Sequence, residues 1–170
     1  MQEHDQDGRA DIIVIGLTGS IGMGKSTVAK MLTELGVPVH DSDEQVHELM
    51  APGGKANPLI GEMFPDAYDE ASQQIDRKAL GKIVFNDEQA REKLESVLHP
   101  LVRKAQLEFI DKHSKAGVQM AALDIPLLFE VGRDKDVDYV MVVSASAEVQ
   151  RERVLHPWRQ VLYCNQPKQI

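Results

Sequence analysis

The sequence predicts an α/β protein with a mostly parallel sheet and a helical insertion. The apolar run at residues 12–17 is typical of a buried parallel strand. Further strand-like runs occur at 118–123 and 139–143, and stretches of helical periodicity separate them. A mainly helical section, about residues 55–116, falls between the second and third predicted strands. We expect this section to form a subdomain.

The first predicted helix follows a glycine-rich stretch, and Gly36 is expected to end it. Its apolar residues recur at positions i, i+3, i+4 and i+7, which is the spacing of one helix face. They are Val28, Met31, Leu32 and Leu35. We therefore expect this face to pack on the sheet.

A short second strand is predicted at residues 37–40, with Pro38 near its beginning or on an edge. Ser42 and Gln45 then have the spacing of a capping box, so the next helix should begin at Ser42. Its apolar face is Val46, Leu49 and Met50.

Two helices are predicted in the later part of the insertion. Residues 77–85 form a short helix with Asp76 as its cap, and Asn86 is expected to cap the next one. Pro100 is unfavourable inside a helix and restricts the residue before it, so a kink or junction is expected at 99–100. Helix should then resume to about residue 115. After the last strand, Ser144 or Ser146 is expected to cap a helix that runs to about residue 155.

A phosphate-binding motif follows the first strand. Residues 19–26, GSIGMGKS, match G-x-x-x-x-G-K-[ST], and the strand before and the helix after supply the context that the motif requires. From Gly19 onward, glycines let backbone N–H groups turn inward around a phosphate, and the helix N-terminus adds partial positive charge. Lys25 should reach the β- and γ-phosphates of ATP, and the Ser26 hydroxyl should ligate Mg²⁺. The alternative is a glycine turn with an exposed lysine.

Acidic residues follow two other predicted strands. Asp41 and Asp43 come after the second strand, and Asp124 closes the third. Because parallel sheets bind ligands beyond the carboxyl ends of their strands, these acids should lie on the same rim as the glycine loop. Asp43 in a first helical turn should stay ionised and could accept a proton from a hydroxyl. Asp124 resembles a Walker B acid that holds Mg²⁺ through water or positions substrate. Each acid could instead be an ordinary turn or cap residue.

Two further residues in the insertion are candidates for ligand binding. Arg77 begins a predicted helix, where positive charge is mildly unfavourable, and this placement suggests an anionic ligand. A solvated surface arginine is the alternative. His99 stands at the expected helix break, where a local hydrogen-bonding role is the alternative to function.

The composition indicates which class of partner and which cellular compartment to expect. The net charge of −8 argues against nucleic acid as a main partner. Cys164 is the single cysteine, so no intramolecular disulfide can form, and no signal peptide is evident. We therefore expect a reducing cytoplasmic location. No apolar run approaches the roughly 20 residues of a membrane helix. Residues 1–11 are polar and are expected to be a flexible N-terminus.

Five segments together resemble the dephospho-CoA kinase family across residues 12–155. In chain order they are GLTGSIGMGKSTVA, LGVPVHDSD, IDRKALGKIVF, LESVLHPLV and DIPLLFE. The glycine loop alone occurs in many phosphate-binding proteins, but its combination with the later segments is specific to this family. The resemblance implies a P-loop kinase-like three-layer fold and transfer of the ATP γ-phosphate to the ribose 3′-hydroxyl of dephospho-CoA.

The resemblance also implies roles for individual residues. The implied ATP-binding residues are Gly22, Met23, Gly24, Lys25, Ser26 and Thr27. Asp43 would be the catalytic base alongside Lys25. Arg77, His99 and Asp124 would line the acceptor site, and the helical section would be the substrate-binding subdomain.

The sequence departs from the family pattern after about residue 155. The family continues from a Q-x-x-R helix, here Gln150 to Arg153, into an arginine-bearing lid, a further helix and a last strand. In this chain residues 156–170 show no helical period, and Pro157 stands where a lid arginine is expected. We therefore expect the lid and last strand to be missing and turnover to be weak, because lid arginines stabilise charge on the transferred phosphoryl group.

Two alternative functions remain open from the sequence. One is another small-molecule P-loop kinase, which the HP and PLL-x-E segments disfavour. The other is a non-catalytic nucleotide-binding module, which the atypical tail favours.

Overall fold

The computed structural model describes residues 12–155 and divides the chain into two compact units. Within the described residues, 12–40 and 117–155 form the first unit and 41–116 form the second. The helical section predicted at about 55–116 therefore belongs to a larger unit that begins directly after the second strand. The predicted N-terminus, 1–11, and the predicted tail, 156–170, lie outside the described residues.

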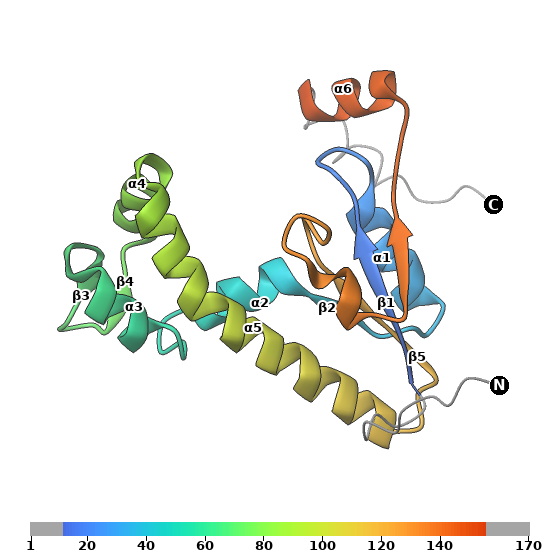
Figure 1. Ribbon diagram of the computed structural model, residues 1–170, viewed down its shortest axis with the longest axis horizontal. Helices are drawn as coiled ribbons and strands as arrows, with labels where there is room; N and C mark the ends of the chain where they lie inside the picture. Colours follow the sequence, from blue (N-terminus) through green and yellow to red (C-terminus); the bar gives the residue numbers. More distant parts are fainter. Residues whose placement is uncertain (1–11, 156–170) are drawn as a thin grey trace, which may run out of the picture. The chain divides into compact units, whose positions relative to one another are not determined.

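The first unit is built around a sheet in which β1 is an interior strand, as Figure 1 shows. Its order is β2 (Val39–Asp41), β5 (Met120–Asp124), β1 (Ile13–Thr18), β6 (Tyr139–Val142). β1 pairs in parallel with both β5 and β6. The predicted α/β class with a parallel sheet is therefore confirmed. β1 is buried from Val14 to Thr18, and only its first residue, Ile13, is exposed, which accounts for its mostly apolar sequence.

Helix α1 (Lys25–Glu34) packs on this sheet over part of its predicted face. Leu32 is buried against Ile15 and Leu17 of β1. Met31 and Leu35, however, are 57% and 79% exposed, so the predicted face is only half correct. The contact with the sheet runs along Val28, Ala29 and Leu32.

Helix α6 (Ala147–Leu155) follows β6 and completes the described part of the first unit. The Oγ atom of Ser146 accepts a hydrogen bond from Val149 N at 3.4 Å, so Ser146 is the cap, one of the two serines predicted. A short 3₁₀ helix, η2 (Arg133–Asp136), lies between β5 and β6.

The second unit consists mainly of helices and has its own apolar core. In chain order its elements are α2 (Ser42–Leu49), α3 (Asn57–Met63), η1 (Pro65–Ala67), β3 (Tyr68–Asp69), β4 (Gln74–Ile75), α4 (Arg77–Asn86) and α5 (Glu88–Lys115). The β3–β4 hairpin was not predicted, because two-residue strands are too short to carry an alternating pattern. The core draws on every helix of the unit, with Ile60, Leu80 and Leu98 among its buried members.

The cap of α2 is Asp41, and the predicted capping box of Ser42 and Gln45 is wrong. The Oδ1 atom of Asp41 accepts hydrogen bonds from the backbone N–H groups of Asp43 and Glu44, at 2.9 and 3.0 Å. Ser42 is instead buried in the first turn, where its Oγ atom accepts a hydrogen bond from Gln106 of α5. Aspartate and serine are about equally good N-cap residues. Because Ser42 is buried and its hydroxyl is bonded to Gln106, Asp41 caps the helix instead.

Helix α5 is continuous through Pro100, so of the kink or junction predicted at 99–100 the junction is wrong. The predicted cap Asn86 is also wrong: Asn86 ends α4, and Asp87 caps α5 by accepting from two backbone N–H groups. Val97 and Val102, one on each side of Pro100, are both buried in the core of the second unit. Packing on both sides of the proline outweighs the cost of its missing N–H group.

Replacing Pro100 with alanine should therefore raise the free energy of unfolding of the second unit. Proline is about 3 kcal/mol less favourable than alanine inside a helix, and Pro100 is exposed, so we expect a gain of about 1–3 kcal/mol. Urea unfolding followed by circular dichroism would measure it. Glu95→Ala, at another exposed site on α5, is the control and should change stability by less than about 0.5 kcal/mol. A loss of stability in P100A would contradict this explanation.

No helix among residues 12–155 is long and apolar enough to cross a membrane.

Candidate active site

The glycine loop after β1 has a backbone conformation that most residues cannot adopt. Gly22 and Gly24 have φ values of +78° and +99°, in the left-handed region that favours glycine. Gly24 is also the N-cap of α1, so the loop leads directly into the positive end of the helix dipole. A loop of this form before a helix N-terminus is suited to binding an anion.

Helix α6 lies against the same loop. Gln150 Nε2 donates a hydrogen bond to Ile21 O at 2.9 Å, and Arg153 Nη1 donates one to Gly22 O at 3.1 Å. A Cβ atom on Gly22 would stand only 2.9 Å from the Cγ2 atom of Val154, so no larger residue fits at position 22 without a shift. Gln150 and Arg153 were expected only as part of the family pattern, with no contact to the loop predicted. Their spacing of three, which places them on one helix face, was the available signal.

Lys25 and Asp124 form an ion pair between the start of α1 and the end of β5. Asp124 is 2% exposed, and the Lys25 side chain is 17% exposed. The parallel pairing of β1 with β5 sets Asp124 opposite Leu17, directly before the glycine loop, and so brings the two charges together. The structure thus confirms the prediction that the loop and this acid share one rim of the sheet. The Lys25 ammonium group offsets the cost of burying the Asp124 carboxylate.

The remaining loop residues lie around this ion pair. Ser26 and Thr27 are exposed in the first turn of α1. The Sδ atom of Met23 accepts a hydrogen bond from Ala145 N, between β6 and α6. Gly19 packs closely on Val143, the residue after β6, since a Cβ atom there would lie 2.6 Å from the Val143 carbonyl oxygen. Glycine at position 19 is therefore required by packing.

Three predicted site residues belong to the second unit. Asp43 is exposed in the first turn of α2, at the positive end of the helix dipole. Arg77 is the first residue of α4, and its guanidinium group contacts His47 of α2. His99 is exposed within α5, so its predicted place at a helix break is wrong. His47 was not predicted, because nothing in the sequence links it to an arginine thirty positions later.

The start of α4, which carries Arg77, is fixed by a strong cap. Backbone N–H groups of Ala79 and then Lys78 donate hydrogen bonds to Asp76 and hold the pKa of its carboxyl below the usual value. A lowered folded-state pKa means that the cap stabilises the helix at neutral pH. This contribution is lost only as acid brings the pH down through that pKa.

Comparisons with known proteins identify the family of this chain. The family model described as dephospho-CoA kinase matches residues 13–160. The dephospho-CoA kinase of Mesorhizobium japonicum is 54% identical over 85% of this chain and 71% of its own length. The dephospho-CoA kinase of Paramagnetospirillum magneticum is 51% identical over 84% of this chain and 66% of its own. The chain thus spans about two thirds of the length of these curated relatives.

Two solved structures share the fold. The crystal structure of TT1252 from Thermus thermophilus has a TM-score of 0.73 and 34% identity, and it covers 89% of this chain and 78% of its own. Dephospho-CoA kinase from Campylobacter jejuni has a TM-score of 0.60 over 90% of this chain and 98% of its own. Its 21% identity is evidence for the fold alone. Because the family model spans nearly all of the described residues and the curated relatives are about half identical, the chain belongs to the dephospho-CoA kinase family.

Proposed function

We propose that the chain transfers the γ-phosphoryl group of ATP to the ribose 3′-hydroxyl of dephospho-CoA, giving coenzyme A and ADP. The observation that carries this proposal is the glycine loop with its Lys25–Asp124 pair, in a chain of the dephospho-CoA kinase family. Phosphoryl transfer needs a cradle for the phosphates and positive charge beside the transferred group, and the loop and Lys25 are suited to both.

In this proposal the first unit binds the phosphate donor. Backbone N–H groups of the loop surround the phosphates, and Lys25 moves from Asp124 to the β- and γ-phosphates. Gly19, Met23 and Thr27 shape the loop around them. Since the positive charge is aimed where negative charge develops, it lowers the barrier to transfer.

Ser26 and Asp124 are the residues that would hold Mg²⁺. Mg²⁺ is commonly bound through one or two carboxylates together with substrate phosphates, and a hydroxyl plus a buried carboxylate fits that pattern. No cluster of three or more acidic, histidine or cysteine side chains occurs within residues 12–155, and a site completed by phosphates does not require one. When bound, the ion supplies further neutralisation of phosphate charge.

The second unit provides the acceptor side of the proposed reaction. Asp43 accepts the proton of the ribose 3′-hydroxyl as the oxygen attacks the γ-phosphorus atom, and ADP leaves. The Asp43 carboxylate is exposed in the first turn of α2 and is therefore accessible to a substrate hydroxyl. Arg77 and His99 contact the acceptor.

Measurement of ADP and coenzyme A formation with purified full-length chain tests the proposal. We expect ADP to form only when dephospho-CoA is present, with coenzyme A as the phosphorylated product by mass spectrometry. Transfer to nucleoside monophosphates but not to dephospho-CoA would overturn the proposal, as would ATP binding in calorimetry with no transfer to any acceptor. A rate near the enzyme median of about 10 per second would contradict only the expected impairment.

Arg153→Met should weaken ATP binding through the glycine loop. The variant keeps the bulk of the side chain but removes the hydrogen bond to Gly22 O. Hydrogen bonds from charged groups are worth about 1.5–3 kcal/mol, so we expect the ATP KM to rise about tenfold, with the dephospho-CoA KM within about twofold. Arg151→Met, at an exposed site on α6, is the matched control. Equal effects from the two variants would show that the contact does not shape the loop.

A further inference from the structure

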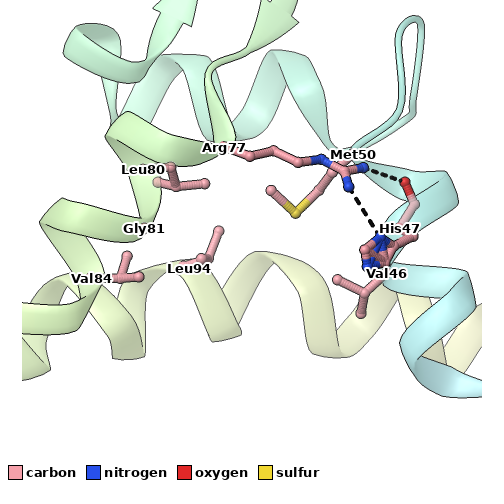
Figure 2. Close-up of a pocket in the computed structure, with 8 residues that line it drawn as sticks. All are labelled: Val46, His47, Met50, Arg77, Leu80, Gly81, Val84 and Leu94. Carbon is pink, nitrogen blue, oxygen red and sulfur yellow. Dashed lines mark hydrogen bonds between the residues drawn. The ribbon is translucent and has the colours of Figure 1, made fainter. Parts of the chain in front are cut away.

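A small apolar pocket lies within the second unit, between α2 and α4, with one residue from α5. Figure 2 shows the residues that line it: Val46, His47, Met50, Arg77, Leu80, Gly81, Val84 and Leu94. Its volume is about 230 Å³. Pockets for whole drug-sized ligands are about 300–1,000 Å³, so this one suits part of a larger molecule.

Arg77 is the positively charged residue of the lining, and His47 fixes its position. Arg77 Nη2 donates a hydrogen bond to the backbone oxygen of His47 at 2.8 Å, and Nη1 lies 3.0 Å from the Nδ1 atom of its ring. Guanidinium has five N–H donors and no acceptor, so a hydrogen bond between these two atoms has Nδ1 as its acceptor. The two contacts use only part of the guanidinium group. The remaining N–H groups can bind an anion at the pocket.

A pocket of this kind recognises an aliphatic group attached close to an anion. Four of its side chains are branched aliphatic ones, and they contribute no hydrogen-bonding group. Of the two proposed substrates, only dephospho-CoA carries a branched aliphatic group beside a phosphate: the dimethyl-bearing carbon of its pantoyl segment, one methylene from the diphosphate ester. ATP has no aliphatic chain beyond its ribose.

We propose that this pocket binds the pantoyl segment of dephospho-CoA, with the dimethyl group inside and the adjoining phosphate on Arg77. His47 is a positioning residue, since it acts by holding the guanidinium group at the pocket. The inference rests on the proposed function and names the part of the acceptor that the second unit recognises. In this proposal the aliphatic part of dephospho-CoA is recognised in the pocket, and the ribose hydroxyl reacts elsewhere.

Gly81→Leu tests the pocket directly. Gly81 lines it, and a Cβ atom there would meet no atom within 4 Å, so the larger side chain can be built without a backbone clash. Glycine is a poor helix former, so the variant should fold at least as stably. We expect the dephospho-CoA KM to rise at least about tenfold, in line with the loss of one or more buried methyl-sized contacts. The ATP KM should stay within twofold.

Lys82→Leu is the matched control, because it adds the same side chain one residue later, outside the lining. Should Gly81→Leu fail to fold, Gly81→Val provides a smaller obstruction. An unchanged dephospho-CoA KM in a folded Gly81 variant would overturn the proposal, as would equal effects from Lys82→Leu.

Calorimetry with the phosphopantetheine fragment of dephospho-CoA separates this proposal from the proposed function. The fragment has the aliphatic chain and phosphate but lacks adenosine, so it can fill the pocket without being phosphorylated at a ribose. We expect it to bind the full chain and to lose at least tenfold in affinity in Gly81→Leu. If the fragment binds in this way but no phosphate is transferred to dephospho-CoA, only the proposed function is contradicted. If phosphate is transferred but the fragment does not bind, only the proposed pantoyl site is contradicted.

The positioning role of His47 is tested by a pair of substitutions. His47→Ala removes the Nδ1 acceptor, whereas His47→Asn places an amide oxygen near the same point. We expect His47→Ala to raise the dephospho-CoA KM about five- to tenfold without changing kcat or the ATP KM, and His47→Asn to recover most of the loss. No difference between the two variants, or a fall in kcat alone, would overturn the positioning role.

Discussion

Replacing Lys25 with methionine is expected to reduce phosphate transfer by at least about 100- to 1,000-fold, the usual effect of removing one group that stabilises transition-state charge. Methionine keeps the length of the side chain and removes its charge. The same variant should lose about 3–5 kcal/mol of unfolding free energy, because Asp124 stays buried at 2% exposure without its positive partner. Steady-state ADP formation and urea unfolding would measure the two effects separately.

The double variant Lys25→Met with Asp124→Asn distinguishes catalysis from stability. Neutralising both partners removes the buried carboxylate charge that Lys25 no longer balances, so most of the lost stability should return. Activity should stay low, since neither substitution restores the positive charge beside the phosphates. If the double variant is as unstable as the single one, the ion pair is not the source of the loss. If Lys25→Met transfers phosphate at the wild-type rate, the glycine loop is not the donor site.

Asp43→Asn is expected to lower kcat by about 100- to 10,000-fold, the range typical of general base catalysis. The amide cannot accept the proton from the ribose hydroxyl, but it has nearly the same size and fits the first turn of α2. Stability should therefore change by less than about 0.5 kcal/mol, as at other exposed sites. Initial rates at saturating substrate would measure kcat, and urea unfolding would measure the stability.

Glu44→Gln is the matched control for Asp43, because both residues are exposed acids in the same helical turn. Both donate a backbone N–H group to the same Oδ1 atom of Asp41, so each substitution disturbs the cap equally little. We expect Glu44→Gln to stay within about twofold of the wild-type rate, as befits a surface substitution. Similar losses in the two variants would mean that the turn needs negative charge in general rather than a base at position 43.

The sheet and the phosphate loop could be predicted from sequence because their signals are local. The apolar run of β1, the glycines after it and the amphipathic start of α1 occur within one stretch of chain. The approach of Asp124 to Lys25 followed from a general rule about parallel strands. The pairing of β1 with β5 then gave the expected result.

Local rules failed where distant packing decided the outcome. Ser42 forms a hydrogen bond with Gln106 of α5, and Asp41 caps α2 in its place. No sequence rule predicts a hydrogen-bond partner so far along the chain. Pro100 stays inside α5 because buried residues lie on both sides of it. The contact of Arg77 with His47 joins two helices that nothing in the pattern links. In each case the tertiary environment outweighed the local preference.

Two apolar clusters among residues 12–155 are each assembled from residues of a single unit. One is built from the sheet and α1, and the other lies entirely within 41–116. Substitutions accumulating in one core therefore need no compensating change in the other. If the proposed roles of the units hold, the unit proposed to bind the acceptor could change its core over evolutionary time while the unit proposed to bind ATP kept its own.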